Sequence, residues 1–309
     1  MENIKIYKKI EFVKPAMVAG WPGMGNVALG TVDYLRRKLG AVKFAQVMVD
    51  ESAALDSVVV EDGMAKLPAP PEYVFYYAKS ANLIIFEGQA QPPGQSGISL
   101  LNKVLDLALE FKATRIYTAA AFPSPVSHKD RAEVYGVANK RSLKDALLKS
   151  GVKIMEDGQV FGLNGLLLGF AEKRGIDAIC LLATMPHYAI NLPNPKASAA
   201  IIEALSKILG FKIDLKEIEE YIAEMDAKME IVEDKVKDVF AIGEGKAEKS
   251  QAPQGEKVVP GYIVEKIERL FQEARADKTK AVDLKKELDR WDLYKAYEDK
   301  FLDLFKENQ

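Results

Sequence analysis

The chain has 309 residues, of which 48% are hydrophobic and 28% charged, and a formal net charge of -2. This length suits one large α/β domain or two average domains, and the near-neutral charge gives no global attraction to nucleic acid or to an acidic membrane. The single cysteine, Cys180, excludes an internal disulfide framework.

At the N-terminus, Met1 to Lys9 mix charged and apolar residues. They lack the uninterrupted apolar run of a signal peptide or a membrane helix. We therefore expect a cytoplasmic protein with neither membrane nor nucleic acid as a partner. The abundance of Lys and Glu fits a thermophilic source.

Between about Lys14 and Gly210, short apolar runs alternate with helical patterns. Apolar residues recur at three- and four-residue spacing in 98–108 and 197–208, which predicts a packing helix in each. The alternation indicates a three-layer α/β/α domain over residues 1–210, with helices on both faces of a mostly parallel sheet. The predicted strands are Ala16–Gly20, Phe44–Val49, Ser57–Val60, Tyr73–Tyr77, Leu83–Phe86, Arg115–Ala119 and Ala178–Ala183, the last with Cys180 in the core.

A glycine-rich turn, Gly20 to Ala28, leaves the first of these strands and opens a helix. Backbone N–H groups and the helix dipole converge at such a turn, so Gly23, Gly25 and Asn26 are candidates for binding an anion or a nucleotide. Asp50 and Glu51 follow at about the distance of a ribose-binding acid. The alternative is a tight turn in which glycine permits close packing of helix and sheet.

His187 follows the strand that contains Cys180, at the carboxyl edge where α/β sites form. In an enzymatic interpretation, His187 or Glu87 transfers protons beside a phosphate held at the Gly20–Ala28 turn. No His or Cys pair stands at metal-ligand spacing, so we expect no metal and no cofactor. A second glycine cluster, Gly158 to Gly169, indicates a helix packed closely on the sheet.

Residues 211–240 carry apolar side chains at alternating four- and three-residue spacing, which is typical of a coiled-coil seam. Periodicity does not decide whether this seam packs on its own chain or on another subunit, and we favour the other subunit slightly. The partner-binding candidates on the seam are Ile218, Ile222, Met225, Met229 and Val232.

Residues 241–259 lack large apolar side chains over most of their length, so we expect a flexible linker. Residues 260–309 then show two further helical patterns. Trp291, Tyr294 and Phe301 are their large aromatic anchors and complete the set of partner-binding candidates. We expect a C-terminal helical extension that needs a docking surface.

Several segments in this order resemble the proteasome-assembly-chaperone family over about residues 10 to 215. They are Gly20-Trp21-Pro22-Gly23-Met24-Gly25, Phe86-Glu87-Gly88-Gln89, Gly162 to Gly169, Leu181-Leu182-Ala183-Thr184 and Asn194-Pro195-Lys196-Ala197. The resemblance implies a nucleoside-phosphorylase-like outline, a homo-oligomer and, as in archaeal and eukaryotic members, binding to proteasome subunits. Catalysis is not an established trait of the family.

Certain relatives dock on the proteasome α-ring through a C-terminal hydrophobic residue, a tyrosine and any residue, whereas this chain ends in Lys306-Glu307-Asn308-Gln309. We therefore expect no docking of that type. The hypothesis that follows is a non-enzymatic assembly chaperone or scaffold that presents helical and loop surfaces to partner subunits, with proteasome subunits or a related family member as the candidate partners. The alternative is a phosphorylase-like or nucleotide-using enzyme.

Overall fold

The computed structural model describes residues 4–49, 58–244, 261–276 and 278–290, together with 293, 294, 297, 300, 301 and 304. The chain forms two compact units, Met1–Gly245 and Lys246–Gln309. Helix α6 of the first unit ends at Glu244.

Nine strands of the described residues form one sheet in the order β1-β3-β6-β7-β2-β8-β11-β9-β10. Their bounds are β1 (Ile4–Ile6), β2 (Ala16–Gly20), β3 (Val42–Val47), β6 (Tyr73–Ala78), β7 (Leu83–Gly88), β8 (Arg115–Ser124), β9 (Val134–Ala138), β10 (Lys153–Ile154) and β11 (Ala178–Pro186). A separate hairpin consists of β4 (Val59–Glu61) and β5 (Met64–Lys66).

The sheet is parallel at its centre and has antiparallel pairs on both sides, since β9 pairs antiparallel with β11 and a longer antiparallel flank lies at the other side. Strands β7, β2, β8 and β11 pair in parallel, whereas β1, β3, β6 and β7 pair antiparallel. Only four residues connect β6 to β7, too few for the crossover that a parallel pair requires. The sheet is thus more mixed than the alternation of patterns predicts, but the predicted three-layer α/β architecture is confirmed.

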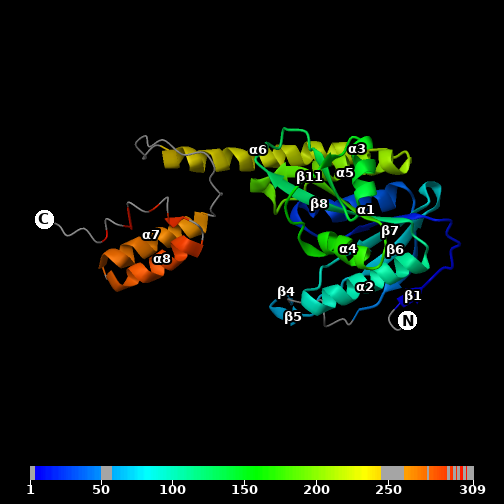
Figure 1. Cartoon of the computed structure of the whole chain (residues 1–309), viewed down its shortest axis with the longest axis horizontal. Coiled ribbons are helices and arrows are strands. Elements are labelled where there is room, and N and C mark those ends of the chain that lie inside the picture. The colour runs from blue at the N-terminus through cyan, green and yellow to red at the C-terminus, as the bar shows by residue number, and fades with distance from the viewer. Residues whose placement is uncertain are drawn as a thin grey trace. The chain divides into compact units, whose positions relative to one another are not determined.

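Two helical layers enclose the sheet, with α1 (Val27–Lys38) and α5 (Pro195–Leu209) on one face and α2 (Gly94–Glu110) and α4 (Gly162–Lys173) on the other (Figure 1). Successive side chains of a strand point to opposite faces, so Met17 belongs to the core beneath α2 and α4 and Val18 to the core beneath α1 and α5. Helix α3 (Arg141–Lys149) contacts β9 and β10, and α6 (Lys216–Glu244) packs on α5.

Cys180 lies in the core beneath α2 and α4, as its apolar neighbours predict. Burial raises the pKa of its thiol to about 12. Because the thiolate is the reactive species, Cys180 is inert at neutral pH.

The second unit contains α7 (Gly261–Ala276), the short 3-10 helix Lys278–Lys280 and α8 (Ala281–Arg290). Its core includes Phe271, Leu284, Leu288 and Phe301. The rings of Tyr294 and Phe301 meet edge to face, with centroids 5.5 Å apart. These two anchors therefore pack within their own unit, while Trp291 lies outside the described residues.

Candidate functional site

The glycine-rich turn after β2 is held by contacts within the domain. Gly25 and Asn26 have left-handed backbone angles, with φ of 61° and 48°. The amide of Gly25 donates to the carbonyl of Ile190 at 2.8 Å, and that of Asn26 donates to Gly23 at 2.9 Å. A side chain at Gly25 would meet Met185 Sδ at 2.9 Å, so the turn is closely packed.

Asn164 of α4 fixes the same turn from the other side. Its Oδ1 accepts from the amide of Trp21 at 3.1 Å, and its Nδ2 donates to the Trp21 carbonyl at 3.2 Å. The side chain is buried and pairs with the backbone as a neighbouring strand would. Thr118 of β8 donates to the Asn164 carbonyl at 2.8 Å, which ties α4, β8 and the turn together.

These bonds bear on the anion-binding hypothesis for Gly23, Gly25 and Asn26. An anion site at a turn depends on backbone N–H groups that point toward the ligand, and the amides of Gly25 and Asn26 already donate to carbonyls of the protein. The geometry favours the packing interpretation, and the anion site stays a prediction. Asp50 and Glu51 lie outside the described residues.

His187 and Glu87 have different partners. Glu87 Oε2 accepts from Arg36 Nε of α1 at 2.8 Å. His187 is exposed in the 3-10 helix that follows β11, and its Nδ1 lies 3.1 Å from the Ser124 carbonyl. Since each side chain is bonded to a different element, the proton-transfer role of either residue stays a prediction.

A cavity of about 320 Å³ opens at the carboxyl edge of the sheet. Its walls are mainly apolar, and Gln91, Gln159 and Asn164 supply polar side-chain atoms. Gln91 Oε1 accepts from the Leu163 amide at 2.7 Å and its Nε2 donates to the Pro22 carbonyl. The amide side chains of Gln91 and Asn164 are thus engaged within the protein, and the mainly apolar cavity suits an apolar group better than a charged ligand.

The first half of the predicted seam packs on its own domain. Ile218 is buried in the core beneath α1 and α5, and Ile222 packs against the same core. Met225 and Met229 are buried against Ala189, while Val232 is half-buried. The structure therefore places these side chains in intramolecular packing, the alternative that periodicity left open, and their binding to a partner stays a prediction.

A polar network fastens α6 to the loop that follows β8. His128 Nδ1 lies 2.5 Å from Glu233 Oε2, and both side chains are buried. The same carboxylate oxygen accepts from Tyr188 Oη at 2.6 Å and from Ser127 Oγ at 2.9 Å. Burial, and next the hydrogen bond to Glu233, raises the pKa of Tyr188 to about 12, so Tyr188 is a donor at neutral pH.

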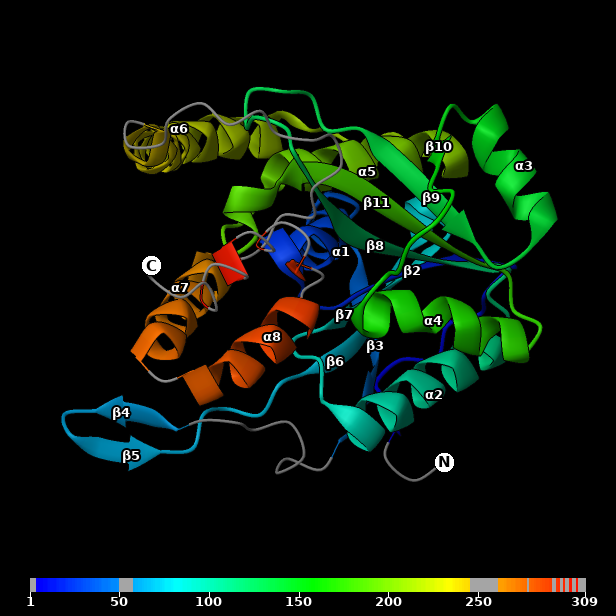
Figure 2. The ribbon, with the colours of Figure 1, turned by 60° about the vertical axis from the view of Figure 1, so that its left-hand side comes forward.

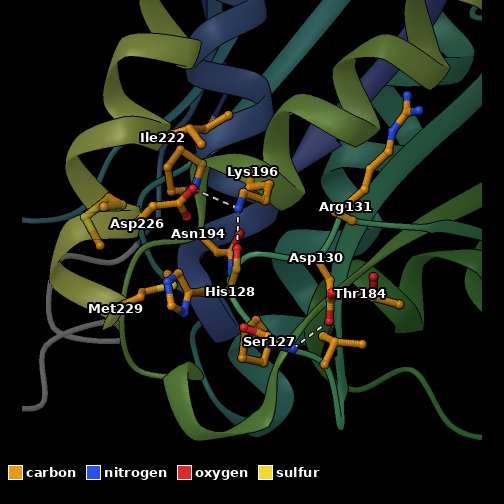
Figure 3. A pocket seen from close by; sticks show the side chains of 15 residues that line it. Ser127, His128, Asp130, Arg131, Thr184, Asn194, Lys196, Ile222, Asp226 and Met229 are labelled. Atoms are coloured by element: carbon orange, nitrogen blue, oxygen red, sulfur yellow. Dashed lines mark hydrogen bonds and ion pairs between the residues drawn. The ribbon is translucent and has the colours of Figure 1, made fainter. Parts of the chain in front are cut away.

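Lys196 of α5 extends this network (Figure 3). Its ammonium group donates to the His128 carbonyl and lies 2.9 Å from Asp226 Oδ2 of α6. The enclosed space among these residues is only about 10 Å³, enough for about one water molecule. We therefore interpret the network as an anchor for α6 rather than as a substrate pocket.

Sequence reasoning missed this anchor. His128 and Glu233 are 105 residues apart, and neither stands in a recognisable motif. The one local signal is the occurrence of a histidine in the Ser127-His128-Lys129-Asp130 loop, which by itself names no partner.

The described parts of the chain contain no cluster of three or more His, Cys, Asp or Glu side chains that could hold a metal ion. Within the same residues, none of the helices combines the length and the apolar character needed to cross a bilayer.

Comparison with models of known protein families identifies one family for this chain. The PAC2 family model matches residues 17–233. An uncharacterized protein of Methanocaldococcus jannaschii is 25% identical over 231 residues, which cover 73% of this chain and 87% of that protein.

Two solved structures from Pyrococcus furiosus share the fold. PbaB, an archaeal proteasome activator, has 26% identity and a TM-score of 0.64, and the match covers 75% of this chain and all of PbaB. PbaA, an archaeal homolog of proteasome-assembly chaperone, has 21% identity and a TM-score of 0.59, with 74% and 96% of the two chains covered.

Proposed function

Since the chain belongs to the PAC2 family, we propose that it is a non-enzymatic proteasome-related assembly factor, acting as a chaperone or as an activator. The observation that carries the proposal is the match to PbaB, a proteasome activator, along the whole length of that protein. The binding partners would be proteasome subunits and further copies of this chain, in the cytoplasm.

The contacts around the candidate site support a binding function. The buried polar groups of the α6 anchor bond to one another, and the side-chain amides of Gln91 and Asn164 in the carboxyl-edge cavity bond to the backbone. An enzyme needs groups directed at its substrate, with a pKa suited to proton transfer. Tyr188, with a pKa of about 12, is not suited to that task at neutral pH.

We also propose that Lys246–Gln309 is a separate helical domain and not part of the shared fold. The family match ends at residue 233, and the described helices of this unit have a core of their own. A partner of this domain would therefore be particular to this chain.

Native mass spectrometry tests the proposal with three preparations from the protein's own host: α subunits alone, β subunits alone and the assembled core particle. A complex with free α or β subunits would support an assembly role, and a complex with the core particle alone would support an activator. The absence of a complex in all three would overturn the proposal.

A thermal-shift screen tests the enzymatic alternative in parallel, using phosphate, nucleosides, ADP and NAD. A ligand that binds the folded state at 100 times its dissociation constant stabilises it by about 2.7 kcal/mol. We expect no shift with any of these compounds. A specific shift, abolished by a substitution in the Gly20–Ala28 turn, would favour the enzyme.

A further inference from the structure

The β4–β5 hairpin carries apolar side chains that its own domain does not cover. Its strands pair in the register Val59↔Lys66, Val60↔Ala65 and Glu61↔Met64. The connecting residues Asp62 and Gly63 both have positive φ, 50° and 78°, the geometry of a tight two-residue hairpin turn.

One face of this hairpin is entirely apolar. Because side chains alternate along a strand, Val58, Val60, Ala65 and Leu67 share a face. The other face carries Val59, Met64 and the pair Glu61 and Lys66, which are joined by an ion pair of 3.0 Å. All the residues of both strands are exposed. Figure 2 shows the hairpin extending away from the sheet and its covering helices.

A two-stranded hairpin with both faces in water is at best marginally stable, and a contiguous exposed apolar patch marks an interaction surface. A partner that covers the apolar face would supply the missing burial. The hairpin therefore requires an apolar, concave counterpart.

The same chain offers such a counterpart in the carboxyl-edge cavity of about 320 Å³. Met24 and Phe161 line it, and both are exposed. The hairpin follows β3, which runs in the same direction as β7 and β2 because β6 is antiparallel to both β3 and β7. Hairpin and cavity thus belong to the same edge of the sheet.

We propose that the apolar face of the hairpin occupies the carboxyl-edge cavity of a second copy of this chain. This contact rests on the homo-oligomer of the proposed function and names the surfaces that form it. The occupant is a second copy because one chain carries both complementary surfaces. Two copies related by a two-fold axis would make this contact twice.

The first test compares the full-length variants Val60→Asp and Val282→Asp in size-exclusion chromatography with light scattering. The two valines are 65% and 60% exposed, and Val282 lies on α8 of the second unit. We expect Val60→Asp to raise the dissociation constant of the oligomer at least tenfold, and Val282→Asp to leave it unchanged. Circular dichroism checks that both variants are folded.

The second test uses a short bis-maleimide cross-linker on a mixture of two differently tagged chains, Leu67→Cys and Phe161→Cys. Cys180 is fully buried, so the native thiol gives little background. We expect a heterodimeric product from the mixture that is lost when Val60→Asp is added to the Leu67→Cys chain.

A monomeric wild-type protein would overturn this inference, as would an oligomer that Val60→Asp leaves intact. A chain that carries both Leu67→Cys and Phe161→Cys gives a further check. Cross-linking only within that chain would also overturn the inference, because the hairpin would then occupy its own cavity. No proteasome subunit is present in either experiment. A failure here therefore leaves proteasome binding standing, and a failure of proteasome binding leaves this contact standing.

Discussion

His128 Nδ1 lies 2.5 Å from Glu233 Oε2 and joins the loop after β8 to helix α6 across 105 residues of sequence. The contact is buried on both sides and is completed by Tyr188 and Ser127. It fixes the position of α6 at the point where the family match ends.

Replacing Glu233 with alanine should detach this part of α6. Removal of Glu233 leaves the buried His128 ring and the Tyr188 hydroxyl without their shared acceptor, at a cost of about 1–3 kcal/mol for each unpaired group. We expect the Glu233→Ala variant to lose that much free energy of unfolding and to show faster hydrogen exchange in residues 225–233. The control is Glu230→Ala, which breaks the exposed pair with Lys129 and should cost no more than about 1 kcal/mol. Equal effects of the two variants would refute the anchor.

Tyr188 should make the anchor sensitive to alkaline pH. Its pKa in the folded protein is about 12, above the ordinary value of 10.0. A group whose pKa is raised by folding contributes stability that is present below its unfolded pKa and is lost as the pH rises through its folded pKa. We expect the stability difference between wild type and Tyr188→Phe, measured by urea denaturation, to be constant below pH 10 and to shrink between pH 10 and 12. A difference that does not change over this range would contradict the raised pKa of Tyr188, which burial and next the hydrogen bond to Glu233 produce.

Alanine substitutions at Gly25 and Gly63 distinguish the cost of backbone strain from the cost of close packing. Both have positive φ, but a Cβ at Gly25 would lie 2.9 Å from Met185 Sδ, whereas one at Gly63 would have no atom within 4 Å. Alanine at either position incurs strain of about 1–2 kcal/mol, and overpacking at Gly25 adds about 1–3 kcal/mol. Chemical denaturation should therefore find Gly25→Ala clearly less stable than Gly63→Ala, and the reverse order would contradict the close packing of the turn.

Asn164 should be required for the structure of the glycine-rich turn. The Asn164→Ala variant leaves the buried amide and carbonyl of Trp21 without these partners, at about 1–3 kcal/mol for each group. Gln89→Ala removes a similar bond, from the Glu72 amide at 2.9 Å, in an exposed position, and should cost much less. Thermal denaturation of the two variants measures the difference, and equal melting temperatures would contradict the role given to Asn164.

Phe271→Ala tests whether the C-terminal unit is an independent domain. Phe271 is buried in the core of that unit, and a buried Phe→Ala substitution costs about 3–5 kcal/mol. We expect calorimetry to show loss of the transition of this unit with no change in the transition of the α/β domain. The exposed Val282→Ala variant should change neither, and a single transition shifted as a whole by Phe271→Ala would contradict the independence of the unit.

The central strands are predictable from sequence because strands buried on both faces are continuous apolar runs. The predicted strand Ala16–Gly20 coincides with β2, and Ala178–Ala183 lies within β11. The strands β9 and β10 and the helix α3 are short or half-exposed, so their patterns are weak. The antiparallel pairing of β6 with β7 follows from their short connection, which the alternation of patterns does not reveal.

The candidate site was much less predictable. The apolar period of residues 211–240 predicts a helix, yet the same stripe suits a contact within the chain or between chains. Only the fold shows that Met225 and Met229 cover Ala189. The glycines of the Gly20–Ala28 turn are visible in the sequence, but the Ile190 carbonyl that accepts from the Gly25 amide comes from a distant segment.

We infer that this protein acts on the proteasome through protein contacts. The most direct measurement follows the formation of core particles from purified α and β subunits of the same host, by native gel and peptidase activity, with and without an equimolar amount of the full chain. Our account predicts that the chain raises the rate or yield of core particles, or the activity of the finished particle. No change in any of the three at micromolar concentrations would contradict it.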